Sequence, residues 1–185
     1  MMKKNYFRYL AISSKAPYLW ILVGLEFLFI YAFHGLFSVS VEKLMEISGG
    51  VGLPDLELYY TVGQLHNIFL RFGDLGRSMY LKLQYIDMVY PLIYASLLAS
   101  LLFLLIKNTR LENLIFLPAL AAFFDYAENI LLRINILAFP NMEKITVQFA
   151  SAATLLKWSM IFLSVVVILG AALRHFFILI KKNKS

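Results

Sequence analysis

Residues Leu117 to Arg133 read LPALAAFFDYAENILLR, and this stretch decides how the rest of the chain is interpreted. It has the apolar character of the middle of a membrane-spanning helix, yet it carries Asp125, Glu128 and Asn129 within one helical turn. Spacings of three and four residues put these side chains on one helical face. Charged groups at membrane depth are costly and usually face a partner, a cavity or a substrate. The stretch therefore predicts a polar site inside the membrane.

The composition agrees with a membrane protein. The chain has 185 residues, of which 61% are hydrophobic, and its mean hydropathy is +0.76. Soluble domains are about 45–50% apolar, so the excess, gathered in long runs, predicts an integral membrane protein. We expect one polytopic domain that covers residues 1–185.

The apolar runs predict an all-α fold with four transmembrane helices in a bundle. The expected helices are 18–37, 81–106, 114–137 and 149–173. Residues 38–78 form a long first loop, in which we expect short interfacial helices that cap the bundle. In that loop Gly73 is expected to end one short helix, and Pro91 is expected to kink the second span.

Basic residues predict the orientation. They cluster in the two terminal segments, 1–17 and 174–185, and in the turn at 107–110, whereas acidic residues dominate the opposite side. The positive-inside rule places both termini in the cytoplasm and the long loop outside, in a multi-pass protein of the cell membrane. Because orientation accounts for the net charge of +6, we expect membrane lipids and no nucleic acid as partners.

Several kinds of site are excluded or not predicted. The absence of cysteine excludes disulfides, thiolate nucleophiles and cysteine-ligated metals. The sequence has no glycine-rich phosphate loop, no H-E-x-x-H and no G-x-S-x-G pattern. We therefore expect no metal and no cofactor.

The remaining polar residues of the spans converge on one depth. From a rise of ~1.5 Å per residue, we expect the polar faces of the last three helices to meet in the outer half of the membrane. The candidate catalytic residues are Asp125, Glu128, Asp87 and Lys157. The candidate ligand-binding residues are Asn129, Thr154, His34, Arg77, Tyr80 and Trp158.

Three functions fit this pattern. The leading hypothesis is a pocket that binds or acts on a lipid or another amphiphile, since an excess of acids over one lysine suits proton handling, cation binding or acid catalysis. The first alternative is a small proton- or cation-coupled transporter, and the second is a structural or assembly subunit whose charges hold the helices together. The sequence does not decide whether the protein is an enzyme or what its oligomeric state is. It also leaves open whether Asp125 or Glu128 is the partner of Lys157.

Overall fold

The computed structural model describes residues 2–36 and 39–182, and these contain helices and turns but no strand. Four helical segments are long and apolar enough to cross a membrane: Ala16–Gly35, Val62–Ile106, Glu112–Ala138 and Lys144–Ile178. The chain is therefore a multi-pass membrane protein. The predicted first span ends at Phe37 and the predicted cap begins at Ser38, and both residues, like residues 1 and 183–185, lie outside the described part.

The N-terminal half begins with α1 (Met2–Ser13) and α2 (Ala16–Tyr31), which continues into the π-helical segment η1 (Ala32–Leu36). Pro17 lies in the first turn of α2, where its missing N–H costs no hydrogen bond. None of the residues of α2 is buried. The first span therefore packs at the periphery of the other helices, mainly against α5.

The segment between the first two spans folds over one end of the helices. It contains α3 (Val41–Ser48), the 3-10 turn η2 (Pro54–Leu56) and the first half of α4 (Val62–Asp87). Thr61 and Gln64 form a reciprocal capping box at the start of α4. Gly73 has a φ of 60° and breaks the helical geometry of α4, which turns the chain from the cap into the membrane-spanning part.

The second span differs from the expected continuous helix at 81–106. It is divided into α4, which ends at Asp87, and α5 (Tyr90–Ile106). Pro91 has no N–H to donate to the carbonyl of Asp87, so the ladder cannot continue across this point. The Tyr126 hydroxyl donates to the carbonyl of Met88 at 3.0 Å, which satisfies a group that the break frees. The break thus leaves Asp87 as the last residue of α4.

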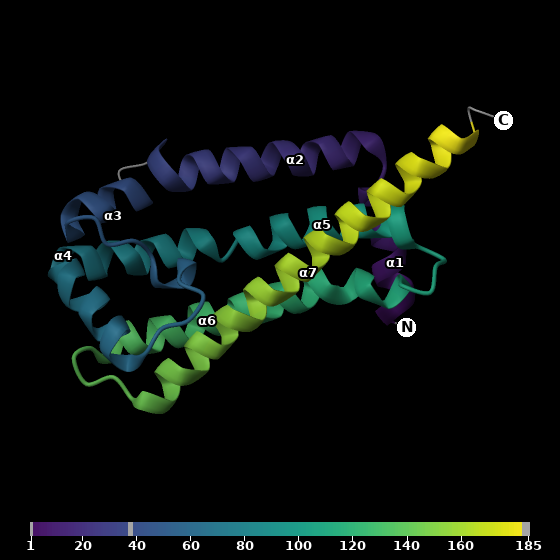
Figure 1. Ribbon diagram of the computed structural model, residues 1–185. Helices are drawn as coiled ribbons and strands as arrows, with labels where there is room; N and C mark the ends of the chain where they lie inside the picture. The colour runs from purple at the N-terminus through teal and green to yellow at the C-terminus, as the bar shows by residue number, and fades with distance from the viewer. Residues whose placement is uncertain (1, 37–38, 183–185) are drawn as a thin grey trace.

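The last two spans pack along each other. The 3-10 turn η3 (Glu112–Phe116) leads into α6 (Leu117–Ala138), and α7 (Lys144–Lys182) returns along it, extending beyond the expected 149–173 at both ends. Figure 1 shows that α7 crosses the other helices, with both termini at the end opposite α3 and α4. The contact between α6 and α7 is the most extensive in the fold.

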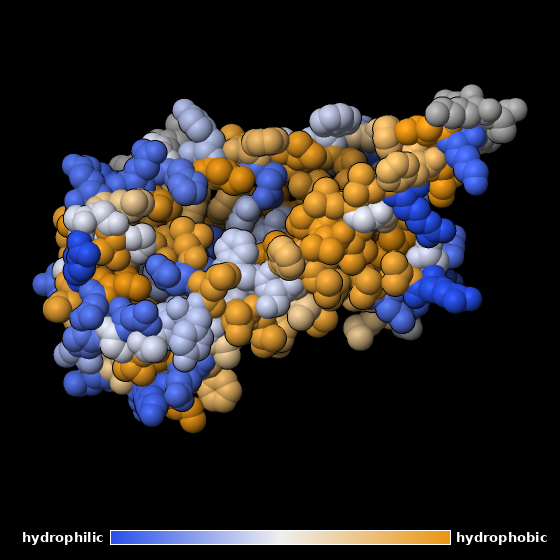
Figure 2. All heavy atoms as spheres, in the orientation of Figure 1, coloured by the Kyte–Doolittle hydropathy of each residue, from blue (hydrophilic) through white to orange (hydrophobic). Residues whose placement is uncertain are grey.

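Two apolar clusters hold the helices at opposite ends. The first joins the cap to α6 and α7 through Leu44, Phe69, Leu83, Leu132 and Val147. The second joins α1 to α5 and η3 through Leu10, Ala99, Leu102, Phe103 and Ile115. Hydrophobic side chains cover much of the visible surface, while hydrophilic ones gather at the cap and at the opposite tip (Figure 2). Such an exposed apolar surface is typical of contact with lipid.

Candidate functional site

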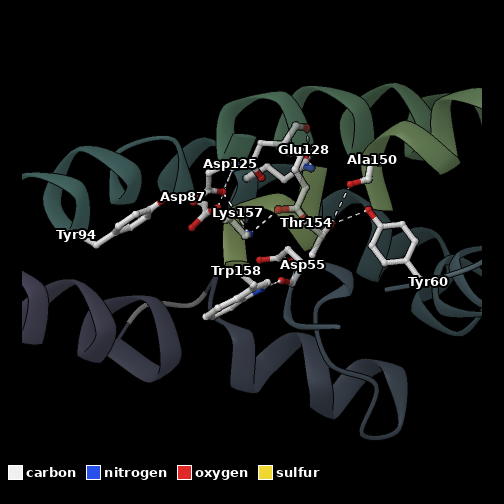
Figure 3. A network of polar contacts seen from close by, with 12 residues as sticks. Asp55, Tyr60, Asp87, Tyr94, Asp125, Glu128, Ala150, Thr154, Lys157 and Trp158 are labelled. Atoms are coloured by element: carbon white, nitrogen blue, oxygen red, sulfur yellow. Dashed lines mark hydrogen bonds and ion pairs between the residues drawn. The ribbon is translucent and has the colours of Figure 1, made fainter. Parts of the chain in front are cut away.

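The polar residues of the spans lie between the two apolar clusters. On α6, Asp125, Glu128 and Asn129 are all buried, as the spacing of the sequence predicts for one inward face. Asp87 is brought to the same place by the end of α4, and Lys157 by α7. Figure 3 shows the side chains of Asp87, Asp125, Glu128 and Lys157 pointing toward one another.

Lys157 is the cation of the site and is held chiefly by Glu128. Its Nζ lies 2.5 Å from Glu128 Oε2 and 3.4 Å from Asp125 Oδ1. Lys157 is 5% exposed and Glu128 is fully buried. Lys157 donates a hydrogen bond to Asp125, but its contact with Glu128 is shorter and more deeply buried, so we infer that Glu128 is the principal partner, a choice that the sequence left open.

Thr154 extends this ion pair toward the cap. Its hydroxyl hydrogen-bonds to Glu128 Oε1 and lies 3.0 Å from the carbonyl of Ala150 and 3.4 Å from the hydroxyl of Tyr60. One turn earlier on α7, the Ser151 hydroxyl accepts from the backbone N–H of Tyr60 at 2.9 Å. The loop before α4 is therefore fastened to the polar face of α7.

Asp125 and Asp87 have neutral donors as well. The Tyr94 hydroxyl donates to Asp125 Oδ2 at 3.0 Å. Asn129 Nδ2 donates to Asp87 Oδ2 at 3.0 Å and lies 3.4 Å from Asp125 Oδ1. Gln84 Nε2 in turn donates to the carbonyl of Asn129 at 3.3 Å. Asn129 thus bridges two carboxylates, while Asp87 has no ion pair among the described residues.

Asp55 is the residue that the sequence analysis missed. It lies in η2, and its carbonyl accepts from Trp158 Nε1 at 3.0 Å, which draws the cap loop onto α7 (Figure 3). Its Oδ1 is buried and has no hydrogen-bond partner in the described part of the chain. Burial raises the pKa of the Asp55 carboxyl, although Lys157 acts in the opposite direction. The only sequence signal was an acid set between apolar Leu53 and Leu56.

A cavity of about 240 Å³ lies beside these groups. Its polar lining comes from Asp55, Asp87, Asp125, Lys157 and His34. Its remaining walls are aromatic or aliphatic: Phe29, Ile30, Phe33, Leu53, Leu56, Tyr90, Tyr94, Trp158 and Ile161. The cavity therefore joins a charged end to an apolar wall that reaches from α2 to α7.

The other predicted site residues lie outside this cavity. Glu128, Asn129 and Thr154 stand behind its polar lining, where they hold the lining side chains in place. Tyr80 is buried in the first apolar cluster, which joins the cap to α6 and α7, and it lies beside a much smaller space that Asp55 and Asp87 also border. Arg77 is not part of the cavity lining, because its guanidinium stacks on Phe139, 4.6 Å from the ring centre, and donates to the carbonyl of Phe69 at 2.9 Å.

Glu26 on the first span also has a partner. Its Oε1 accepts from the Tyr90 hydroxyl at 2.7 Å, while its Oε2 is buried without one. The Tyr90 ring meets that of Tyr94 edge-on, with 5.3 Å between the centres. Glu26 is thus linked, through two tyrosines, to the side of the cavity where Asp125 lies.

No cluster of three or more acidic or histidine side chains suited to a metal ion occurs within residues 2–36 and 39–182. Comparison with protein-family models, with curated proteins and with solved structures gives no match. The function of the chain must therefore be inferred from its own geometry.

Proposed function

We propose that the protein binds an amphiphile whose polar end is a protonated amine. One observation carries the proposal: three aspartates, Asp55, Asp87 and Asp125, line the cavity, together with one lysine, Lys157. Glu128 already holds this ammonium at 2.5 Å. A cation in the cavity would offset the excess of acidic groups over this one ammonium, whereas an anionic group would add to the excess.

The walls suit the rest of such a ligand. Tyr90, Tyr94 and Trp158 line the cavity, and aromatic rings attract alkylammonium groups. The volume of about 240 Å³ lies below the roughly 300–1,000 Å³ of sites that enclose a drug-sized ligand. The cavity therefore accommodates the polar end and the first carbons, and a longer chain extends out of it.

The chain of the ligand leaves through the side of the protein. The apolar lining includes Phe29, Ile30 and Phe33 of the first span, as well as Trp158 and Ile161 of α7. Since α2 has no buried residue and packs mainly on α5, few packing contacts hold it to α7. An amphiphile can then enter from the lipid without crossing the cap.

The proposal includes an orientation for the protein. The spans form a four-helix bundle in the cell membrane, with both termini in the cytoplasm and the cap outside, as the basic residues favour. The cavity then lies in the outer half of the membrane, and the cap loop that supplies Asp55 covers it.

Fluorescence of Trp158 tests the proposal. The chain has two tryptophans, and Trp20 is 73% exposed on α2, so Trp20→Phe leaves one reporter in the cavity wall. A dibrominated octadecylamine added to this variant in detergent should quench the fluorescence of Trp158 at low concentration, and the quenching should saturate. The matched dibrominated alcohol, which lacks the charge, should cause only the non-specific quenching that results from its partitioning into the micelle.

Variants of the carboxylates give the control. Asp87→Asn retains the acceptor for Asn129 but removes the charge, and we expect it to weaken amine binding about tenfold or more, because hydrogen bonds to charged groups contribute about 1.5–3 kcal/mol. Asp74→Asn removes an exposed acid of the cap and should bind like the parent. Equal quenching by amine and alcohol, or no effect of Asp87→Asn, would contradict the proposal.

The contact between Glu26 and Tyr90 favours a second candidate, proton or cation movement through the same site. It places a carboxylate of the first span within 2.7 Å of a tyrosine that lines the cavity. In liposomes, flux that disappears in Glu26→Gln and in Asp125→Asn would favour this function. Protein that carries no flux above empty liposomes would leave amphiphile binding as the function of the cavity.

A further inference from the structure

A second cavity, of about 700 Å³, lies at the end of the molecule that carries both termini. It lies between the turn after α5 and the last part of α7. Its lining includes Arg110 and Arg174, together with Val167, Gly170 and Ala171 of α7. It shares no lining residue with the first cavity, the one proposed to bind an amine (the amine cavity).

Charge is the first argument for a ligand. Arg110 and Arg174 line the same cavity, and neither has a carboxylate within ion-pair distance among the described residues. The nearest acid in sequence, Glu112, is engaged by Lys3 at 3.1 Å and by the backbone N–H of Asn108 at 3.1 Å. Two arginines that line one cavity suit a phosphate, because the guanidinium group binds phosphate with parallel hydrogen bonds.

Position is the second argument. Arg110 follows the end of α5 at Ile106, and Arg174 is the first charged residue of α7 after the uncharged run 158–173. The arginines therefore lie at headgroup depth, while Val167 and Ala171 continue the cavity toward the hydrocarbon layer. Basic pockets at this depth between transmembrane helices bind anionic lipid headgroups.

Gly170 is part of the cavity lining, and a Cβ placed on this residue would meet no atom within 4 Å, so the backbone borders open space here. An acyl chain can occupy that space next to the phosphate. Inorganic phosphate would use the arginines but not the groove.

We propose that this cavity binds an anionic phospholipid, with its phosphate between Arg110 and Arg174 and an acyl chain over Gly170. The site is separate from the amine cavity, and the proposal does not depend on the function of that cavity. It assigns a specific lipid site to the end of the protein where the basic residues gather.

Native mass spectrometry of the full chain in nonionic detergent tests the proposal. Dioleoyl phosphatidylglycerol should bind with one-to-one saturation, and dioleoyl phosphatidylcholine should not. The double variant R110Q/R174Q should bind phosphatidylglycerol about thirtyfold more weakly, from the usual contribution of a basic residue near an anionic lipid. Both arginines are exposed and without ion pairs in the described part of the chain, so the variant should fold.

Two control variants distinguish loss of this site from a general loss of positive charge and from a general effect of a larger side chain. K4Q/R8Q removes the same charge from α1, outside the cavity, and should bind like the parent. Gly170→Leu keeps both arginines but fills the groove, and should lose phospholipid binding, while Gly24→Leu, at another open position on α2, should not.

Three results would overturn the proposal. One is equal binding of phosphatidylglycerol by R110Q/R174Q and K4Q/R8Q. Another is binding of phosphatidylcholine as strong as that of phosphatidylglycerol. The third is full occupation of the site by inorganic phosphate with no loss in Gly170→Leu, which would assign the cavity to a soluble anion.

Discussion

Lys157→Met breaks the buried ion pair between α6 and α7, and its effect can be worked out from two distances. At an effective dielectric constant of about 20, a separation of 2.5 Å from Glu128 corresponds to a gross attraction of roughly 7 kcal/mol, and 3.4 Å from Asp125 to roughly 5 kcal/mol. Desolvation offsets much of this. Removing one partner of a buried pair typically costs about 3–5 kcal/mol, and we expect Lys157→Met to lose that much free energy of unfolding.

Double variants show which carboxylate depends on the lysine. In Glu128→Leu/Lys157→Met, Asp125 keeps the Tyr94 hydroxyl as a donor, so most of the lost stability should return. In Asp125→Leu/Lys157→Met, the fully buried Glu128 loses its cation and keeps only Thr154, so stability should stay about 3–5 kcal/mol below that of the parent.

The assay is unfolding in mixed micelles, with SDS as denaturant and far-UV circular dichroism as the signal. Lys43→Met is the control, because its pair with Glu46 at 2.6 Å is exposed and should contribute no more than about 1 kcal/mol. Recovery by the Asp125 double and not by the Glu128 double would refute the assignment. Single variants as stable as the parent would show that the charges do not hold α6 to α7.

Three further predictions concern other parts of the molecule. Burial raises the pKa of Asp55, so the folded state binds its proton more tightly than the unfolded chain does, and the free energy of unfolding falls as pH rises above the ordinary aspartate range. Asp55→Asn should remove this loss. Thermal unfolding at pH 4 and pH 7 (values chosen to bracket the range) should therefore show that the variant is more stable than the parent at the higher pH alone. Tyr90→Phe leaves the half-buried Glu26 without its donor and should cost about 1 kcal/mol in the same unfolding assay, whereas an unchanged stability would show that the contact is not formed. Because the chain has no cysteine, a single cysteine introduced by Lys43→Cys or Lys107→Cys reports the topology directly. An impermeant maleimide should label Lys43→Cys in intact cells and Lys107→Cys only after permeabilisation. The reverse pattern would contradict the proposed orientation.

Long apolar runs were sufficient to predict the helical fold and the four spans, because hydrocarbon leaves a chain few alternatives to helices. The i, i+3, i+4 spacing likewise predicted that Asp125, Glu128 and Asn129 would share a buried face. These features depend on the local period of the chain, which can be read without any knowledge of what packs against it.

Features that depend on distant contacts were not predictable. Asp55 reaches the site because its carbonyl accepts from Trp158, and nothing near Asp55 in sequence indicates that contact. The preference of Lys157 for Glu128 over Asp125 rests on less than one ångström of distance between two carboxylates on one helical face. The kink expected at Pro91 is a break after Asp87, and this break sets the place of that carboxylate.

The most direct test of amphiphile binding is photo-crosslinking with a long-chain amine that carries a diazirine in its first carbons. The labelled peptides of the full-length protein should come from the first span near Phe33 and from α7 near Trp158 and Ile161, the two apolar walls of the cavity. An excess of octadecylamine should abolish this labelling, and an excess of octadecanol should not. Labelling that is spread over all exposed apolar faces would contradict an amine site in the cavity. Labelling that octadecanol reduces as much as octadecylamine does would contradict it as well.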